Sequence, residues 1–201
     1  MTSDRRRERM TEVLSRRLVS VHCVVEALHH RHNISAILRT CDALGIHNVH
    51  LVAGHRFKVS QGAARGAERW LKLHRHPTPE SAVAALRERG FRIFVADLAD
   101  DAVTPEAVPI DGPVALWFGA ELIGVSDEAR ASADGVVTLP MHGFAQSLNV
   151  SVAAALALRP VAERVRAAGH GSMPTAGQAE QLQRWLDRDD VLRIGIRHRS
   201  G

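Results

Sequence analysis

The chain of 201 residues contains no tyrosine, and its aromatic residues make up only 4% of the total. Stacking of bases on aromatic side chains therefore cannot be its main mode of binding. Cysteine is also scarce, because only Cys23 and Cys41 are present, both in apolar surroundings. Two thiols without a zinc-binding spacing favour reduced, buried cysteines in a cytoplasmic protein over a disulfide framework or a metal site.

Long apolar runs are missing as well. The apolar stretch from Val150 to Leu158 is far too short to span a membrane, and the Arg-rich N-terminus has no apolar segment behind it. The nucleotide-binding fingerprints G-x-G-x-x-G and G-x-x-x-x-G-K-[ST] do not occur, nor does a Ser-centred elbow. The apolar share of 45% nevertheless allows a sizeable core, so we expect one domain with terminal extensions.

What the chain has instead is arginine. The net charge is +4 and the pI is near 10.0, and arginine supplies nearly all of the positive charge. Residues 2–17 are predicted to form a basic helix, and the tail from Gln181 to Gly201 is also basic. The arginines of the first segment are Arg5, Arg6, Arg7, Arg9, Arg16 and Arg17. They form either a solvated helix face or an arm that contacts a nucleic-acid backbone.

Between these ends, strand and helix patterns alternate. The predicted strands are Val19–Glu26, His47–Ala53, Trp70–Leu73, Phe91–Ala96, Pro113–Phe118 and Val136–Leu139. The predicted helices are Asn33–Leu44, Gln61–Gly66, Pro79–Arg89, Ser126–Ala133, a helix after Asn149 and Pro174–Asp187. This alternation predicts an α/β fold, a parallel sheet with helices on both faces. The core is expected at 18–161, with an N-terminal helical extension at 1–17 and a C-terminal one at 162–201.

The stretch from Leu139 to Arg159 organises the rest. A strand end leads into a polar loop in which Gln146, Ser147 and Asn149 precede a helix that is apolar on nearly every side. Such polar residues can cap the free N–H groups of the helix, and an all-apolar helix is usually buried all round. The stretch is therefore either a capped core helix or a ligand cradle. Pro160 is expected to interrupt the helix, whose pattern resumes to Arg166.

Two further polar groups accompany this loop. Asn33 and Arg39 stand on one predicted helix, with Arg39 opposite its apolar stripe, and Gly119 and Glu121 directly follow a buried strand. Ligands of open α/β sheets bind outside the carboxyl ends of strands. The histidines at positions 29–32 invite a metal interpretation, but no partnering Cys or carboxylate pattern supports it. The residues alone thus predict an α/β domain that binds an anionic ligand.

Three segments, Asn33–Gly45, Leu116–Ser126 and Leu139–Val152, together resemble the SpoU family of RNA ribose methyltransferases. Each motif is weak alone, but all three occur in order and at the spacing of the family, over nearly the whole chain. The resemblance is greatest to the TrmH branch, which methylates the 2′-hydroxyl of guanosine 18 in tRNA. It implies a C-terminal trefoil knot that holds S-adenosylmethionine, a homodimer, tRNA as partner, a cytoplasmic location, and neither membrane nor metal.

The resemblance also implies site residues. The catalytic set would be Arg39, Asn33, Glu121, Ser147 and Asn149. The cofactor-binding set would be Ala96, Leu98, Gly119, Leu139, Leu148 and Asn149. The RNA-binding set would be Arg5, Arg6, Arg7, Arg9, Arg16, Arg17 and Arg39. The chain departs from the family at His30-Arg31-His32, Leu122-Ile123, His142 and Phe144, which affects the expected RNA contacts more than the chemistry.

Alternatives to this function remain at the level of sequence. The target could be another tRNA or rRNA position, or the chain could be an RNA-binding relative without turnover. A DNA-binding protein is disfavoured because no helix-turn-helix pattern stands out. Family accounts assign Arg39 as the base, yet a guanidinium gives up a proton only at a large cost in free energy at neutral pH. Arg39 would otherwise hold an RNA phosphate or stabilise a developing alkoxide.

Overall fold

The computed structural model describes residues 3–28, 30–52, 66–120 and 123–197, with side chains as far as Asp189. The segment 53–65, where the sequence predicts a loop with Arg56 and Lys58 and a short helix, lies outside the described residues, as does Glu121. The chain divides into two compact units. One comprises Met1–Arg17 and Ser172–Gly201, and the other comprises Leu18–Gly171. They are described separately below.

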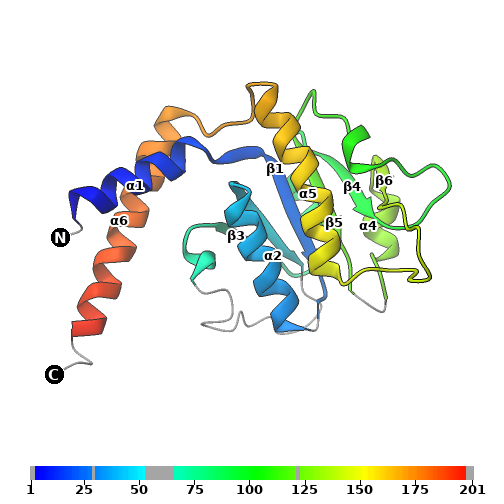
Figure 1. The fold of residues 1–201 in the computed structure, drawn as a ribbon, viewed down its shortest axis with the longest axis horizontal. Coiled ribbons are helices and arrows are strands. Elements are labelled where there is room, and N and C mark those ends of the chain that lie inside the picture. Colours follow the sequence, from blue (N-terminus) through cyan, green and yellow to red (C-terminus); the bar gives the residue numbers. More distant parts are fainter. Residues whose placement is uncertain (1–2, 29, 53–65, 121–122, 198–201) are drawn as a thin grey trace. The chain divides into compact units, whose positions relative to one another are not determined.

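The larger unit is built on a six-stranded sheet in which every pair of neighbouring strands is parallel (Figure 1). The strands are β1 (Leu18–Glu26), β2 (Ile46–Val52), β3 (Lys72–His76), β4 (Arg92–Ala96), β5 (Val114–Phe118) and β6 (Gly135–Val137). Their order is β3-β2-β1-β5-β4-β6. The prediction of a parallel α/β sheet is confirmed.

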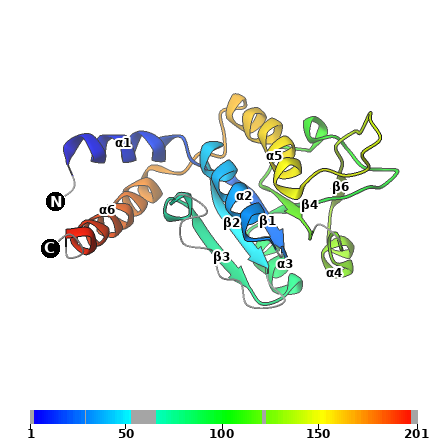
Figure 2. The same ribbon diagram turned by 60° about the horizontal axis from the view of Figure 1, so that its bottom comes forward.

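Helices cover both faces of this sheet, as predicted. Figure 2 shows α2 (Arg31–Ala43) and α5 (Val150–Ala167) over one face, with α3 (Pro79–Arg87) and α4 (Asp127–Ala131) over the other. Two short 3-10 helices, η1 (Ala67–Arg69) and η2 (Pro105–Ala107), lie in the connections. Each face has its own apolar cluster, so the strands between them read as nearly continuous runs of Val, Ile and Leu.

Helix α2 shows why the periodicity was informative. Its stripe of Ile34, Ile37, Leu38 and Cys41 is buried, and Arg39 on the opposite side is exposed. The helix begins at Arg31, two residues before the predicted start, and its N-cap residue His30 makes no capping side-chain bond. The prediction that the helix starts at Asn33 was therefore wrong, and the Asn33 side chain serves another contact.

Helix α5 runs without a break from Val150 to Ala167, through Pro160. The predicted interruption was wrong. Ala157, Leu158, Val161 and Ala162 are buried on both sides of the proline, and such packing stabilises a helix more than one missing hydrogen bond weakens it.

The helix is also not buried all round, contrary to the expectation from its composition. Val152 is 46% exposed and Leu156 is 50% exposed. These two side chains, one turn apart, form a short exposed apolar stripe on α5.

The smaller unit consists of α1 (Asp4–Ser15) and α6 (Thr175–Arg197), which pack side by side in Figure 1. Met10 and Leu14 of α1 and Trp185 and Leu186 of α6 are buried. Helix α6 extends well beyond the predicted Pro174–Asp187 at its C-terminal end. Of the helices that the structure describes, none has the length and apolar character that a membrane crossing requires.

Candidate ligand cavity at the carboxyl edge of the sheet

The larger unit contains a cavity of about 280 Å³ where β4, β5 and β6 end. This is the edge at which parallel sheets bind ligands. The cavity is lined by Ala96, Asp97, Leu98, Phe118, Gly119, Ala120, Gly124, Val137, Thr138, Leu139, Met141, Gln146, Ser147, Leu148, Val150, Ala153 and Ala157. Apolar side chains and backbone edges dominate this lining, which suits a flat, largely apolar ligand with a few polar ends.

One wall of the cavity is a tightly closed loop after β5. Ala120 and Gly124 exchange two backbone hydrogen bonds, of 3.0 and 2.8 Å. A Cβ atom on Gly119 would lie 2.1 Å from the carbonyl oxygen of Gly124, and Gly124 has a φ of +76°. Both positions therefore require glycine, and the wall presents backbone rather than side chains to the cavity.

The polar loop before α5 is joined to α2 by two asparagines. The Asn149 Oδ1 atom accepts hydrogen bonds from the backbone N–H (2.9 Å) and the hydroxyl (2.6 Å) of Ser151. Asn149 is thus the N-cap residue of α5, as predicted. The Asn149 Nδ2 atom donates to Asn33 Oδ1 at 3.1 Å. Two motifs that lie 116 residues apart in the sequence thus meet beside the cavity.

Most residues predicted to bind the cofactor line this one cavity. They are Ala96, Leu98, Gly119, Leu139 and Leu148, and Ser147 of the predicted catalytic set lines it as well.

The catalytic residues of the prediction are more dispersed. Asn33 and Asn149 contact each other, and neither is among the residues that line the cavity. Arg39 is exposed on α2 and also does not line it. Glu121 lies outside the described residues. The roles assigned to these side chains therefore stay predictions.

Sequence reasoning missed several lining residues, among them Asp97, Thr138 and Met141. Asp97 forms an ion pair with Arg130 of α4, and its Oδ1 atom accepts a hydrogen bond from the backbone N–H of Leu98 at 2.7 Å. The signal that could have found Asp97 and Thr138 is their place directly after strands β4 and β6.

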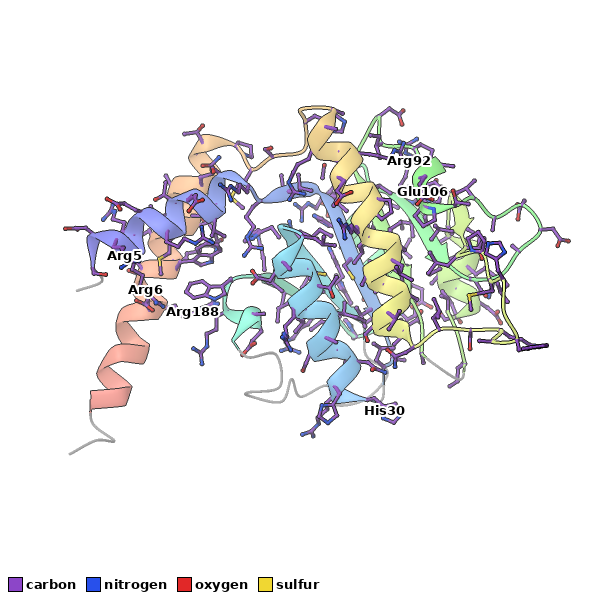
Figure 3. The ribbon with its side chains drawn as sticks, in the orientation of Figure 1. Arg5, Arg6, His30, Arg92, Glu106 and Arg188 are labelled. Atoms are coloured by element: carbon purple, nitrogen blue, oxygen red, sulfur yellow. The ribbon has the colours of Figure 1, made fainter. Side chains whose placement is uncertain are left out.

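The arginines of α1 differ in their surroundings. Arg5 and Arg7 are exposed, Arg9 and Arg16 pair with Glu12, and the Arg6 guanidinium lies 2.5 Å from Asp189 of α6. Figure 3 shows Arg5 and Arg6 on α1 and Arg188 on α6.

Arg17 does not belong with this basic surface. It is fully buried, and its guanidinium stacks 5.4 Å from the centre of the Trp185 ring. We therefore remove Arg17 from the predicted RNA-binding set and treat it as part of the packing between α1 and α6. By contrast His30, which departs from the family pattern, is exposed at the start of α2 (Figure 3).

A row of histidines crosses the sheet on β1, β2 and β3. The Nε2 atom of His50 lies 2.9 Å from Nδ1 of His22, and its Nδ1 atom lies 2.8 Å from Nε2 of His76. Burial lowers the pKa of His22 to about 2 and that of His50 to about 3, so both rings are neutral. Among the described residues, no group of three or more His, Cys, Asp or Glu is arranged to hold a metal ion.

Residues 20–159 match the model of the SpoU rRNA Methylase family. The chain belongs to this family. Relatives include a tRNA (guanosine(18)-2′-O)-methyltransferase of Thermus thermophilus, 44% identical over 160 residues, or 78% of this chain and 81% of that protein. The protein of the same name from Escherichia coli is 39% identical, over 87% of this chain and 79% of its own length.

Solved SpoU structures share the fold. The A. aeolicus TrmH/SpoU tRNA modifying enzyme superposes with a TM-score of 0.84 at 31% identity, covering 92% of this chain and 97% of its own. An AdoMet-bound rRNA methyltransferase from Sinorhizobium meliloti superposes with a TM-score of 0.68 at 22% identity, over 78% of this chain and 60% of that one. The similarity thus extends through both units of the chain for the first structure and concerns the fold alone for the second.

Proposed function

We propose that this SpoU protein transfers a methyl group from S-adenosylmethionine to the ribose 2′-hydroxyl of guanosine 18 in tRNA. The observation that carries the proposal is the cavity at the carboxyl edge of the sheet, with the Asn33–Asn149 contact beside it. The relatives from T. thermophilus and E. coli, whose names state this activity, match most of the chain at 44% and 39% identity.

The cavity has features that fit S-adenosylmethionine. The backbone wall of Gly119 and Gly124 admits no side chain, so a planar ring can lie against it, and Leu98, Leu139 and Leu148 supply apolar cover. When bound, the donor supplies a methyl group on a sulfonium, which leaves as a neutral thioether. Because the leaving group is neutral, the protein needs no general acid.

The chain must still accept or redirect one proton from the attacking hydroxyl. Arg39 is exposed on α2, one and a half turns after Asn33, where it is available to the RNA. A guanidinium suits bidentate contact with a phosphate and can stabilise a developing alkoxide. We assign Arg39 the role of holding an RNA phosphate, and this phosphate takes the proton. Glu121 and Ser147 remain further members of the proposed catalytic set.

The two ends of the chain are proposed to bind tRNA. We propose that both basic ends are helical extensions of a methyltransferase domain. The boundary expected between 161 and 162 falls inside α5, and the compact unit that holds the C-terminal end begins at Ser172. Arg5, Arg6, Arg7, Arg9 and Arg16 lie on or at the end of one helix, and arginine contacts to phosphates release counterions and supply salt-dependent affinity. A protein acting on tRNA would work in the cytoplasm, which is our inference for its location.

We further propose a homodimer built on a trefoil-knotted core. The exposed stripe of Val152 and Leu156 on α5 belongs to the same unit as other exposed apolar side chains, of which Ile123 is 77% exposed and Phe144 fully exposed. A second copy that covers this stripe would remove apolar side chains from water. Sedimentation that shows only monomer at micromolar protein would contradict the dimer.

The function is tested by incubating the purified protein with unmodified tRNA transcripts and methyl-labelled donor, then mapping the methylated nucleotide. We expect label at guanosine 18 and none on a transcript with a 2′-deoxyribose at that position. Label at another nucleotide would overturn the choice of position. Tight tRNA binding without donor consumption would instead support a non-catalytic RNA-binding relative.

A further inference from the structure

A buried carboxylate lies behind the glycine wall of the cavity. Glu26 is the last residue of β1 and is only 6% exposed. Its Oε2 atom accepts a hydrogen bond from the indole N–H of Trp117 at 2.8 Å and another from the backbone N–H of Ser126 at 3.3 Å. Burial of a carboxylate is costly unless donors compensate it, so these two bonds constrain both donors strongly.

The two donors stand on either side of the loop that forms the wall. Trp117 is the penultimate residue of β5, and Ser126 is the N-cap of α4, where its hydroxyl accepts a bond from the N–H of Ala129. The cavity-lining residues Gly119, Ala120 and Gly124 come between them in the chain. One carboxylate oxygen therefore ties the entry and the exit of this loop to the end of β1.

The wall has little tolerance for movement. Gly119 lies so close to the Gly124 carbonyl that a Cβ atom on Gly119 would clash with it, and two backbone hydrogen bonds join Ala120 to Gly124. A shift of either end of the loop would consequently change the shape of the backbone surface that faces the ligand.

We propose that Glu26 is a positioning residue for the methyl donor. Through Trp117 and Ser126 it holds Gly119, Ala120 and Gly124, the described residues of the wall, in their binding shape. Glu26 does not line the cavity, so it acts through the wall and not by contact with the ligand. This inference rests on the proposed methyltransferase function. It concerns the affinity for the donor and leaves the affinity for tRNA unaffected.

The first test compares Glu26→Leu with Glu26→Gln. Leucine removes the acceptor and leaves two buried N–H groups unsatisfied, whereas the carbonyl oxygen of glutamine can still accept both bonds. For Glu26→Leu we expect KM for S-adenosylmethionine and Kd for S-adenosylhomocysteine to rise about tenfold or more, with KM for tRNA within about twofold. Glu26→Gln should stay within about threefold of wild type.

Arg87→Leu is a matched control for a general loss of stability. The Arg87 guanidinium donates three hydrogen bonds, to the carbonyl oxygens of Phe91 and Ser132 and to Asp134, and none to a cavity-lining residue. It should lower the unfolding temperature while donor KM stays near that of wild type. The proposal is overturned if Glu26→Leu keeps wild-type donor affinity. It is also overturned if Glu26→Leu loses donor affinity and tRNA affinity by the same factor and Arg87→Leu shows the same loss of both.

A second pair of variants keeps the proposal testable if Glu26→Leu does not fold. Ser126 has a φ of −62°, which proline adopts readily. Ser126→Pro removes the hydroxyl cap and the N–H donor, while Ser126→Ala removes the cap alone. A donor Kd several-fold weaker in Ser126→Pro than in Ser126→Ala supports the role of the bond to Glu26, and equal values contradict it.

Wild-type behaviour separates this inference from the proposed function. If the wild-type protein binds S-adenosylhomocysteine but methylates no tRNA, the function fails while the comparison of donor affinities among the variants still stands. If wild type methylates tRNA and Glu26→Leu matches it in donor KM, only the positioning role fails.

Discussion

Two regions of the larger unit gather polar side chains on the same sheet and use them in opposite ways. Ser147 and Asn149, in the loop before α5, and Arg39, on α2, are exposed, and Asn149 donates a hydrogen bond to Asn33. On β1 and β2 the imidazoles of His22 and His50 are buried and hydrogen-bonded to each other. The first set is exposed to solvent, whereas the rings of the second set pair with each other inside the fold.

Polar residues of an α/β domain thus differ in whether they stabilise the fold or remain available to a ligand. A histidine that is neutral and buried among other histidines contributes to the stability of the fold, and its removal should change unfolding more than turnover. An exposed arginine on the surface of a helix, such as Arg39, contributes little to folding, and its removal should change turnover alone.

The largest effect is expected for Arg39→Ala. Arg39 lies opposite the buried stripe of α2, so its removal opens no cavity, and the unfolding temperature and donor affinity should stay near wild type. Turnover should fall ~100-fold or more, about 3 kcal/mol, the scale of one positioned charge. Arg39→Lys should also be poor because a point charge cannot replace the planar fork. Single-turnover methylation at saturating tRNA measures this, and a near-normal rate would make Arg39 a surface arginine only.

The histidine row should make the fold sensitive to acid. Burial is the main cause of the lowered pKa of His22, of His50 and of His74, the last to about 4, and the positive charges of Arg89 and Lys72 add to it. The unfolded chain takes up protons below about pH 6.5, while these folded imidazoles do not. Their contribution to stability is thus complete above about pH 6.5 and is lost as the pH falls toward about 4.

We therefore expect each of these three histidines to lower the free energy of unfolding by up to about 1.4 kcal/mol per pH unit between about pH 6.5 and 4.5. His50→Leu should start less stable, because it leaves His22 and His76 without their partner, and should show a shallower slope. Urea unfolding at neutral pH and at about one and two pH units below it measures both. Equal slopes for the two proteins would show that other groups dominate the acid response.

Asn149→Ala should show a smaller effect on a different quantity. The substitution removes the cap of α5 and the contact with Asn33, both at the loop that carries the cavity-lining Ser147 and Leu148. We expect about tenfold weaker binding of S-adenosylhomocysteine by calorimetry, with a loss of stability of about 1 kcal/mol. Asn149→Asp keeps the capping oxygen but cannot donate to Asn33, so it separates the two roles. Unchanged donor affinity in both variants would remove Asn149 from the site.

Much of this organisation could be read from the sequence because local patterns determine it. The stripe from Ile34 to Cys41 indicated α2, and the caps Ser126 and Asn149 indicated the starts of α4 and α5. Strand β3 was placed too early, at Trp70–Leu73, because its apolar residues resemble a strand. The observed strand, Lys72–His76, is polar, and pairing with β2 and contacts to Asn48 and His50 stabilise it.

Contacts between distant segments could not be read in this way. The bond between Glu26 and Trp117 joins residues 91 positions apart, and the contact of Asn33 with Asn149 joins residues 116 apart. Neither has a local signature, because the sequence does not show which strand ends become neighbours until the order of the sheet is known. For the same reason the burial of Arg17 against Trp185 was missed, although both residues stand in basic segments.

The smallest effect is expected at the basic helix α1. Arg5 is exposed, so Arg5→Gln should leave folding unchanged and remove one phosphate contact. tRNA affinity should fall only about two- to threefold, while the slope of log Kd against log salt should decrease by about one. Arg92→Gln is the matched control, because Arg92 pairs with Asp111 on the larger unit. Equal salt slopes for Arg5→Gln and wild type would show that α1 does not contact the tRNA backbone, which would leave Arg39 and α6 to supply the basic contacts.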